Sequence, residues 1–100
     1  MAFQFLKPAA DRFNASGFDE AINEALIELF ESILKEVLEP GNEDKLEFAS
    51  DSTGVIRVRV EQITLQATYK AEFWVEFDPR TIRYVCTHAR TLRESHPGFG

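Results

Sequence analysis

The sequence has little cysteine and no long apolar run, and each absence removes a class of protein. Cys86 is the only cysteine, so no intrachain disulfide can form and a small disulfide-held scaffold is excluded. No apolar stretch reaches the roughly 18 residues that cross a membrane. Residues 1–8 lack the cationic segment and apolar run of a secretory signal. We therefore expect a cytoplasmic protein whose thiol is packed rather than reactive.

Signatures of catalysis, phosphate binding and metal binding are also missing. Cys86 and His88 are two residues apart and would share one face of a strand, as a nucleophile pair needs, but nothing near them supplies an oxyanion pocket. Cys86, His88 and His96 lack the paired spacing of metal ligands. The sequence therefore predicts no enzyme activity, no cofactor and no metal.

The composition is that of one globular domain. The 100 residues are 44% hydrophobic and 28% charged, which is enough apolar material for a core. The net charge of -6 is concentrated in residues 1–44, which hold ten acidic and three basic side chains and would repel phosphate. We expect a single domain over residues 1–100, with an N-terminal arm at 1–15 and a loose C-terminal tail at 91–100.

One long helix, at residues 18–38, is the strongest pattern. Ser16 and Asp19 predict a capping box at its start, and the Pro-Gly pair at 40–41 predicts its end. Its apolar side chains spread over roughly 200° of the helical wheel, which is more than one sheet covers. They divide into two seams. The first seam contains Ile22, Leu26, Leu29, Ile33 and Val37, and the second contains Ile27, Phe30, Leu34 and Leu38. We expect the second seam to need its own partner, either the N-terminal arm or another subunit.

After Gly41 the apolar period changes to alternation, which predicts antiparallel strands. The expected segments are residues 45–50, 55–60, 63–77 and 81–89. The first two would form a hairpin around a turn at 51–54, and a bulge at 61–62 would turn the opposite face inward. A second turn is expected at 78–80.

The predicted fold class is α+β, with one long helix packed on a curled antiparallel sheet of about four strands. This order of elements resembles the cystatin-like or NTF2-like arrangement in architecture only, because no motif of those families is visible. Such a resemblance implies a fold and no function.

Trp74 points most directly to function. It shares a face with Glu72 and Glu76, while the opposite face already supplies the core, so we expect it to mark a contact surface. The alternative is that the N-terminal arm, or the tail with Phe99, covers it. We predict a non-enzymatic protein-interaction module that forms a homodimer through its helix and sheet face. The expected interaction surface comprises Ile27, Phe30, Leu34, Leu38 and Trp74.

Two other functions stay open. The curled sheet and helix can enclose a small apolar ligand. The residues expected to line such a cavity are Tyr69, Phe73, Tyr84 and His88. RNA binding through the basic sheet face is the second alternative. The residues that suggest it are Arg57, Arg59, Lys70, Arg83 and Trp74. The acidity of the chain disfavours nucleic acid, the first two arginines can pair with Glu47 or Glu72 across the ladder, and no membrane partner is expected.

Overall fold

The computed structural model describes residues 3–98 and shows an α+β fold with three helices and a mixed four-stranded sheet. The elements are β1 (Phe3–Phe5), α1 (Lys7–Asn14), α2 (Glu20–Leu38), α3 (Glu43–Ala49), β2 (Ile56–Ile63), β3 (Ala67–Asp78) and β4 (Arg83–Ser95). The sheet order is β1-β4-β3-β2. β1 runs parallel to β4 and the other pairs are antiparallel. No helix within residues 3–98 is long and apolar enough to cross a membrane.

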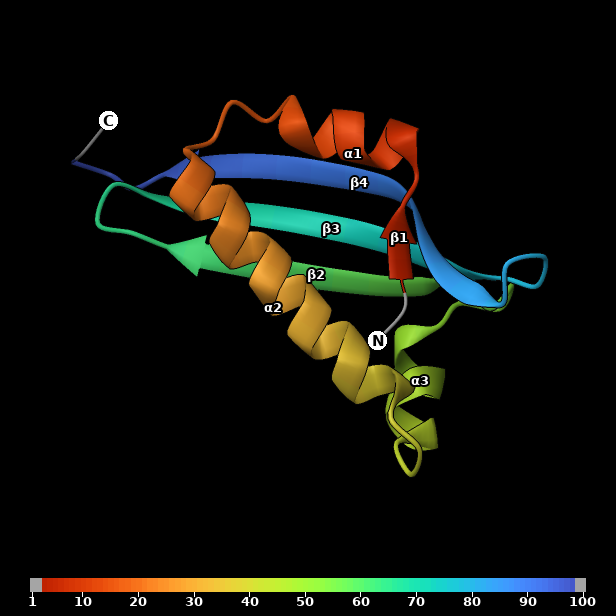
Figure 1. Cartoon of the computed structure of the whole chain (residues 1–100). Coiled ribbons are helices and arrows are strands. Elements are labelled where there is room, and N and C mark those ends of the chain that lie inside the picture. The colour runs from red at the N-terminus through yellow and green to blue at the C-terminus, as the bar shows by residue number, and fades with distance from the viewer. Residues whose placement is uncertain (1–2, 99–100) are drawn as a thin grey trace.

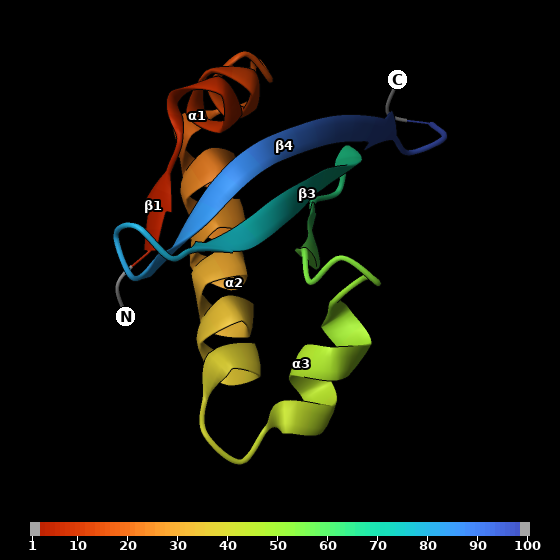
Figure 2. The same ribbon diagram turned by 90° about the vertical axis from the view of Figure 1, so that its right-hand side faces the viewer.

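Two helices lie on the same face of the twisted sheet. Figure 1 shows α1 along β4 and α2 crossing β3 and β2 diagonally. In the view of Figure 2, both helices lie on one side of the strands and α3 lies beyond the β2 edge. The core therefore forms between α2 and the face of the sheet beneath it.

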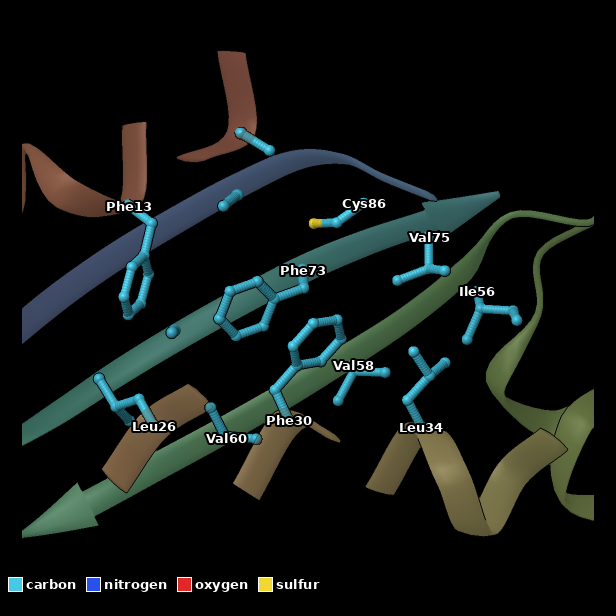
Figure 3. Packing of buried hydrophobic residues seen from close by; sticks show 13 residues of the cluster. Phe13, Leu26, Phe30, Leu34, Ile56, Val58, Val60, Phe73, Val75 and Cys86 are labelled. Atoms are coloured by element: carbon cyan, nitrogen blue, oxygen red, sulfur yellow. The ribbon is translucent and has the colours of Figure 1, made fainter. Parts of the chain in front are cut away.

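The core is built on strict alternation in β2, where Ile56, Val58 and Val60 are buried and the residues between them are exposed. The buried side chains of α2 project onto this face (Figure 3). Phe30 stacks on Phe73 with ring centroids 4.1 Å apart and an interplanar angle of 17°. Both rings are fully buried, so the centre of the core is an aromatic stack.

The N-terminal arm is part of the fold. Pro8 lies in the first turn of α1, where a missing backbone N–H costs no helical hydrogen bond. Phe5, at the end of β1, lies 5.7 Å from Phe30 and 5.9 Å from Phe73 between ring centroids. Phe13 of α1 contacts the Phe73 ring at 5.5 Å. Residues 3–14 therefore contribute side chains to the core.

The second seam of the long helix is covered within the chain, and the N-terminal arm, one of its two predicted partners, contributes to that cover through Phe5, which contacts Phe30. Leu26 of the first seam and Phe30 and Leu34 of the second are all fully buried within the chain. These three positions span one arc of about 80° on the wheel. Ile27 and Leu38 lie at the margin of this arc, half-buried against the same core. The curvature of the sheet, together with β1, covers both seams at once, apart from Leu29 of the first seam, which is 38% exposed.

The start of α2 also differs from the prediction, whereas its end at Leu38 is confirmed. The N-cap is Asp19, which makes no side-chain capping bond. Ser16 Oγ instead accepts a hydrogen bond from the backbone N–H of Phe18 at 3.1 Å. The expected capping box does not form because the helix begins later than the sequence indicated.

Residues 45–50, predicted as a strand, lie mostly in α3. Leu46 and Ala49 are three residues apart, which places them on one helical face, and both pack against the core. Phe48 is 94% exposed. The expected turn at 51–54 does form, with Asp51 Oδ1 accepting from the Thr53 N–H at 2.8 Å, but it joins a helix to a strand. The predicted hairpin is therefore absent.

The predicted bulge at 61–62 is also wrong, because β2 continues to Ile63. The reversal lies at 64–66, where the Thr64 N–H donates to the Ala67 carbonyl at 2.9 Å. The buried apolar positions are even-numbered in β2 and odd-numbered in β3 because this turn separates the two strands.

The last strand is longer than predicted. β4 continues to Ser95, and the His96 N–H donates to the Gln66 carbonyl at 2.8 Å. The expected loose tail from residue 91 is therefore paired over its first half. The turn at 78–80 is confirmed, with the Arg80 N–H donating to Asp78 Oδ1 at 2.9 Å.

Candidate interaction surface

Within residues 3–98, no helix covers the face of the sheet that points away from α1 and α2 (Figures 1 and 2). We call this surface the outer face. Its side chains come from alternate positions of three strands. They are Arg57, Arg59 and Glu61 of β2, Lys70, Glu72, Trp74 and Glu76 of β3, and Val85, His88, Arg90, Leu92 and Glu94 of β4.

A β-bulge decides which residues of β4 reach the outer face. Trp74 pairs with His88, whereas the next residue, Val75, pairs with Cys86, so Thr87 is the extra residue. Cys86 therefore points into the core and His88 points outward. The prediction that this pair shares a face is wrong, because strict alternation does not hold across the bulge.

Cys86 is unsuited to act as a nucleophile in this position. Its side chain is fully buried, and burial raises the pKa of the thiol to about 11. Its sulfur donates to the His88 backbone carbonyl at 3.3 Å, while the His88 ring lies across the sheet. The thiol is a packing group of the core, as the sequence indicated.

Glu72 is the centre of the outer face. Its side chain is only 8% exposed, and three arginines surround it. Arg59 Nε donates to Oε2 at 2.8 Å, and Arg90 Nη2 donates to Oε1 at 2.9 Å. Arg57 Nε lies 3.6 Å from Oε2. Three guanidinium groups and one carboxylate leave a local excess of two positive charges.

The buried carboxylate remains ionised. Burial raises the pKa of Glu72. The hydrogen bond from Arg59 and the charges of Arg59, Arg90 and Arg57 lower the pKa by more than burial raises it, so the pKa lies below the ordinary 4.5. The side chains of Arg59 and Arg90 are 72% and 67% exposed. Glu72 thus orients the guanidinium groups while most of their surface faces solvent, where they can bind carboxylates.

Trp74 lies beside this cluster on the same face. Arg57 Cζ lies 5.4 Å from the Trp74 ring centroid, and the His88 ring lies 4.8 Å from it. Trp74 is half-buried, covered in part by these two neighbours, and Phe99 lies outside the described residues. Arg57 therefore joins the tryptophan to the Glu72 cluster.

A hollow of about 450 Å³ opens on the outer face. Its lining includes Arg59, Glu72 and Arg90 of the cluster, together with Glu61, Lys70 and Leu92. Lys70 is paired with Glu94 at 2.5 Å, so it adds little net charge. Leu92 is 55% exposed and gives the hollow an apolar side.

A second hollow, of about 550 Å³, lies on the opposite side of the molecule between α1 and α2. We call it the helix groove. Its apolar lining consists of Phe5, Ala10, Phe13 and Ile27. Its polar lining consists of Asn14, Glu20, Asn23, Glu24, Glu28 and Glu31.

The five residues of the predicted interaction surface do not lie together. Phe30 and Leu34 are fully buried and unavailable to any partner. Ile27 lines the helix groove, and Leu38 is half-buried near the end of α2. Trp74 is on the outer face, across the sheet from the other four. The predicted surface is therefore wrong as a unit, because the sheet separates its members.

The four residues predicted to line a ligand cavity also separate. They are Tyr69, Phe73, Tyr84 and His88. His88 lies on the outer face, whereas Phe73 lies on the helix face and is stacked on Phe30. These residues cannot surround one cavity. Among the described residues, no group of three His, Cys, Asp or Glu side chains is placed to hold a metal.

The predicted pairing of Arg57 and Arg59 with Glu72 is confirmed, but the sequence reading missed Arg90. Arg90 lies just beyond the predicted end of the last strand at residue 89. Its face also depends on the bulge at Thr87. The signal that could have found it is the alternation of Arg90 and Leu92 with Ala89 and Thr91. Arg83, the other predicted basic residue, lies at the start of β4 and donates to Gln4 at 3.4 Å.

Comparison with protein-family models, with curated proteins and with solved structures found no match to this chain. The likeness to cystatin-like or NTF2-like architecture stays a prediction.

Proposed function

We propose that this protein is a non-enzymatic protein-interaction module that associates with a second copy of itself through the outer face of its sheet. The observation that supports this proposal is the arginine cluster held by buried Glu72 next to Trp74. Tryptophan and arginine are enriched at the centres of protein interfaces. Because Glu72 already orients the arginines, less side-chain entropy is lost when they bind.

The arginine cluster favours a partner that brings carboxylates to it, whereas the outer face as a whole is balanced, with four basic and four acidic side chains. The cluster carries an excess of two positive charges, whereas the whole chain carries -6. A second copy of the chain therefore offers the carboxylates that the cluster requires. Nucleic acid fits less well, because its many phosphates require an extended basic surface, whereas the basic and acidic side chains of the outer face balance. A protein partner in the cytoplasm remains the favoured setting.

Analytical ultracentrifugation at low salt tests this proposal. Over roughly 1 μM to 1 mM protein, the weight-average mass of the wild type should rise above the 11.4 kDa of the monomer. Arg59→Glu places a negative charge in the cluster and should keep the protein monomeric. Arg59 is 72% exposed, so its replacement leaves no cavity in the core. Because Arg59→Glu removes a hydrogen-bond partner of buried Glu72, far-UV circular dichroism checks that the variant is folded.

Arg80→Glu is the matched control, because Arg80 is exposed in the turn after β3 and the charge change is the same. This variant should associate like the wild type. A wild type that stays monomeric throughout the range, or equal loss in both variants, would contradict the proposal. Salt-dependent binding of single-stranded RNA by the wild type would favour the nucleic-acid alternative instead.

A further inference from the structure

We infer that the outer face of one copy contacts the helix groove of the next, so that copies associate head to tail. This inference rests on the proposed self-association and specifies which surface of the second copy is used. It is carried by three observations: the chemistry of the groove, the local charge of the arginine cluster and the position of the two surfaces in the fold.

The helix groove combines an apolar floor with an acidic border. Phe5, Phe13 and Ile27 contribute to the floor. Glu20, Glu24 and Glu28 follow one another at four-residue spacing on α2, so they project along the same side of the helix. A partner that fits this groove needs positive charge together with apolar surface.

The outer face supplies both requirements. Its arginine cluster has two positive charges in excess, and Trp74 and Leu92 are the large apolar side chains near it. Arginine pairs with carboxylates through parallel hydrogen bonds, which the exposed guanidinium groups of Arg59 and Arg90 can form. The two surfaces of the same chain are therefore complementary in charge and in polarity.

The outer face and the helix groove lie on opposite sides of the molecule, so a two-fold symmetric dimer cannot form both outer face–groove contacts at once. The groove lies between α1 and α2, which cover one side of the sheet (Figure 2). The cluster projects from the other side of the sheet. A two-fold contact centred on Glu72 would bring one arginine cluster against another, which is repulsive. Contact between unlike surfaces avoids this repulsion and continues from copy to copy unless the ring closes.

A mixing experiment with two variants tests the arrangement. Arg59→Glu removes a functional outer face and leaves the groove intact. The double substitution Glu24→Gln and Glu28→Gln weakens the groove and leaves the outer face intact. Each variant alone should self-associate at least about tenfold more weakly than the wild type. Mixed in equal amounts, they should form a heterodimer, because the outer face of the groove variant can still bind the groove of the other.

The mixture should stop at this heterodimer, whereas the wild type should continue to larger species as its concentration rises. The net charges are -8 for Arg59→Glu and -4 for the groove variant, from -6 minus two and -6 plus two. Both variants are therefore negative, and overall charge cannot drive their association. The double substitution Glu39→Gln and Glu47→Gln changes the charge equally outside the groove and should associate like the wild type.

The outcomes separate the two proposals. A wild type that never associates overturns the proposed function and this inference with it. Association that Arg59→Glu abolishes but the groove variant retains overturns only the head-to-tail contact. The absence of a heterodimer in the mixture, with both variants folded by circular dichroism, also overturns it.

Discussion

Replacement of Phe30 by alanine tests whether α2 is a core helix or a helix with an exposed seam. Phe30 is fully buried, stacks on Phe73 at 4.1 Å and lies 5.7 Å from Phe5. Loss of the ring removes its transfer free energy and leaves a cavity that neighbouring rings fill only in part. We expect the free energy of unfolding to fall by about 3–5 kcal/mol.

This loss is a large share of the roughly 5–15 kcal/mol that stabilises a domain of this size. It corresponds to a melting temperature lower by about 12 °C or more. In urea, with a slope of about 1–3 kcal/mol per molar, the midpoint should fall by at least ~1 M. Far-UV circular dichroism during urea titration, at micromolar protein, measures the change without interference from association.

Leu29→Ala is the control, because Leu29 is the preceding residue on the same helix and is 38% exposed. It should cost about 1 kcal/mol. A loss of stability in Phe30→Ala no larger than in the control would contradict the burial of Phe30 in the core. So would a Phe30→Ala variant that loses self-association while the urea midpoint stays unchanged, since that result would place Phe30 at an interface.

Three further predictions follow from the charged cluster, the thiol and the tryptophan. The pKa of Glu72 is lowered on folding, so its ionisation stabilises the protein above about pH 4.5, and this contribution is lost as the pH falls through the folded pKa. Glu72→Gln should therefore be less stable than the wild type at pH 7 and should lose less stability on acidification. Urea titrations that give the same pH profile for both proteins would contradict this. With its pKa raised to about 11, the Cys86 thiol should react with an aromatic disulfide reagent at pH 8 only after unfolding in urea, and rapid reaction of the native protein would contradict its burial. Trp74 is the only tryptophan, so its emission should shift to shorter wavelength and resist acrylamide quenching as the wild type associates, whereas in Arg59→Glu both properties should stay constant with concentration.

The patterns that depend on local periodicity could be predicted from the sequence. The end of α2 at Leu38 follows from the Pro-Gly pair after it, and the alternation in β2 follows from valines interleaved with arginines. The pairing of Arg57 and Arg59 with Glu72 also followed, because cross-strand neighbours of opposite charge are favoured in an antiparallel ladder. The α+β class and the acidic face of the helix needed no tertiary information.

The remaining features depend on contacts between distant segments. Leu46, Phe48 and Ala49 satisfy either a strand or a short helix, and packing of Leu46 and Ala49 against the core decides for α3. The extra residue at Thr87 moves every later side chain of β4 to the other face, which brings Arg90 to Glu72 and separates His88 from Cys86.

The burial of α2 likewise depends partly on local periodicity and partly on long-range contacts. Its apolar arc was evident from spacing alone, because the period of a helix is fixed by its backbone geometry. Whether that arc meets one surface or two depends on the curvature of the sheet and on the position of β1, which pairs with a strand about 80 residues away in the chain. Such long-range pairing is set by the total burial that the whole chain achieves. The covering of α2, and the absence of a helix over the opposite face of the sheet within residues 3–98, therefore became evident only from the fold.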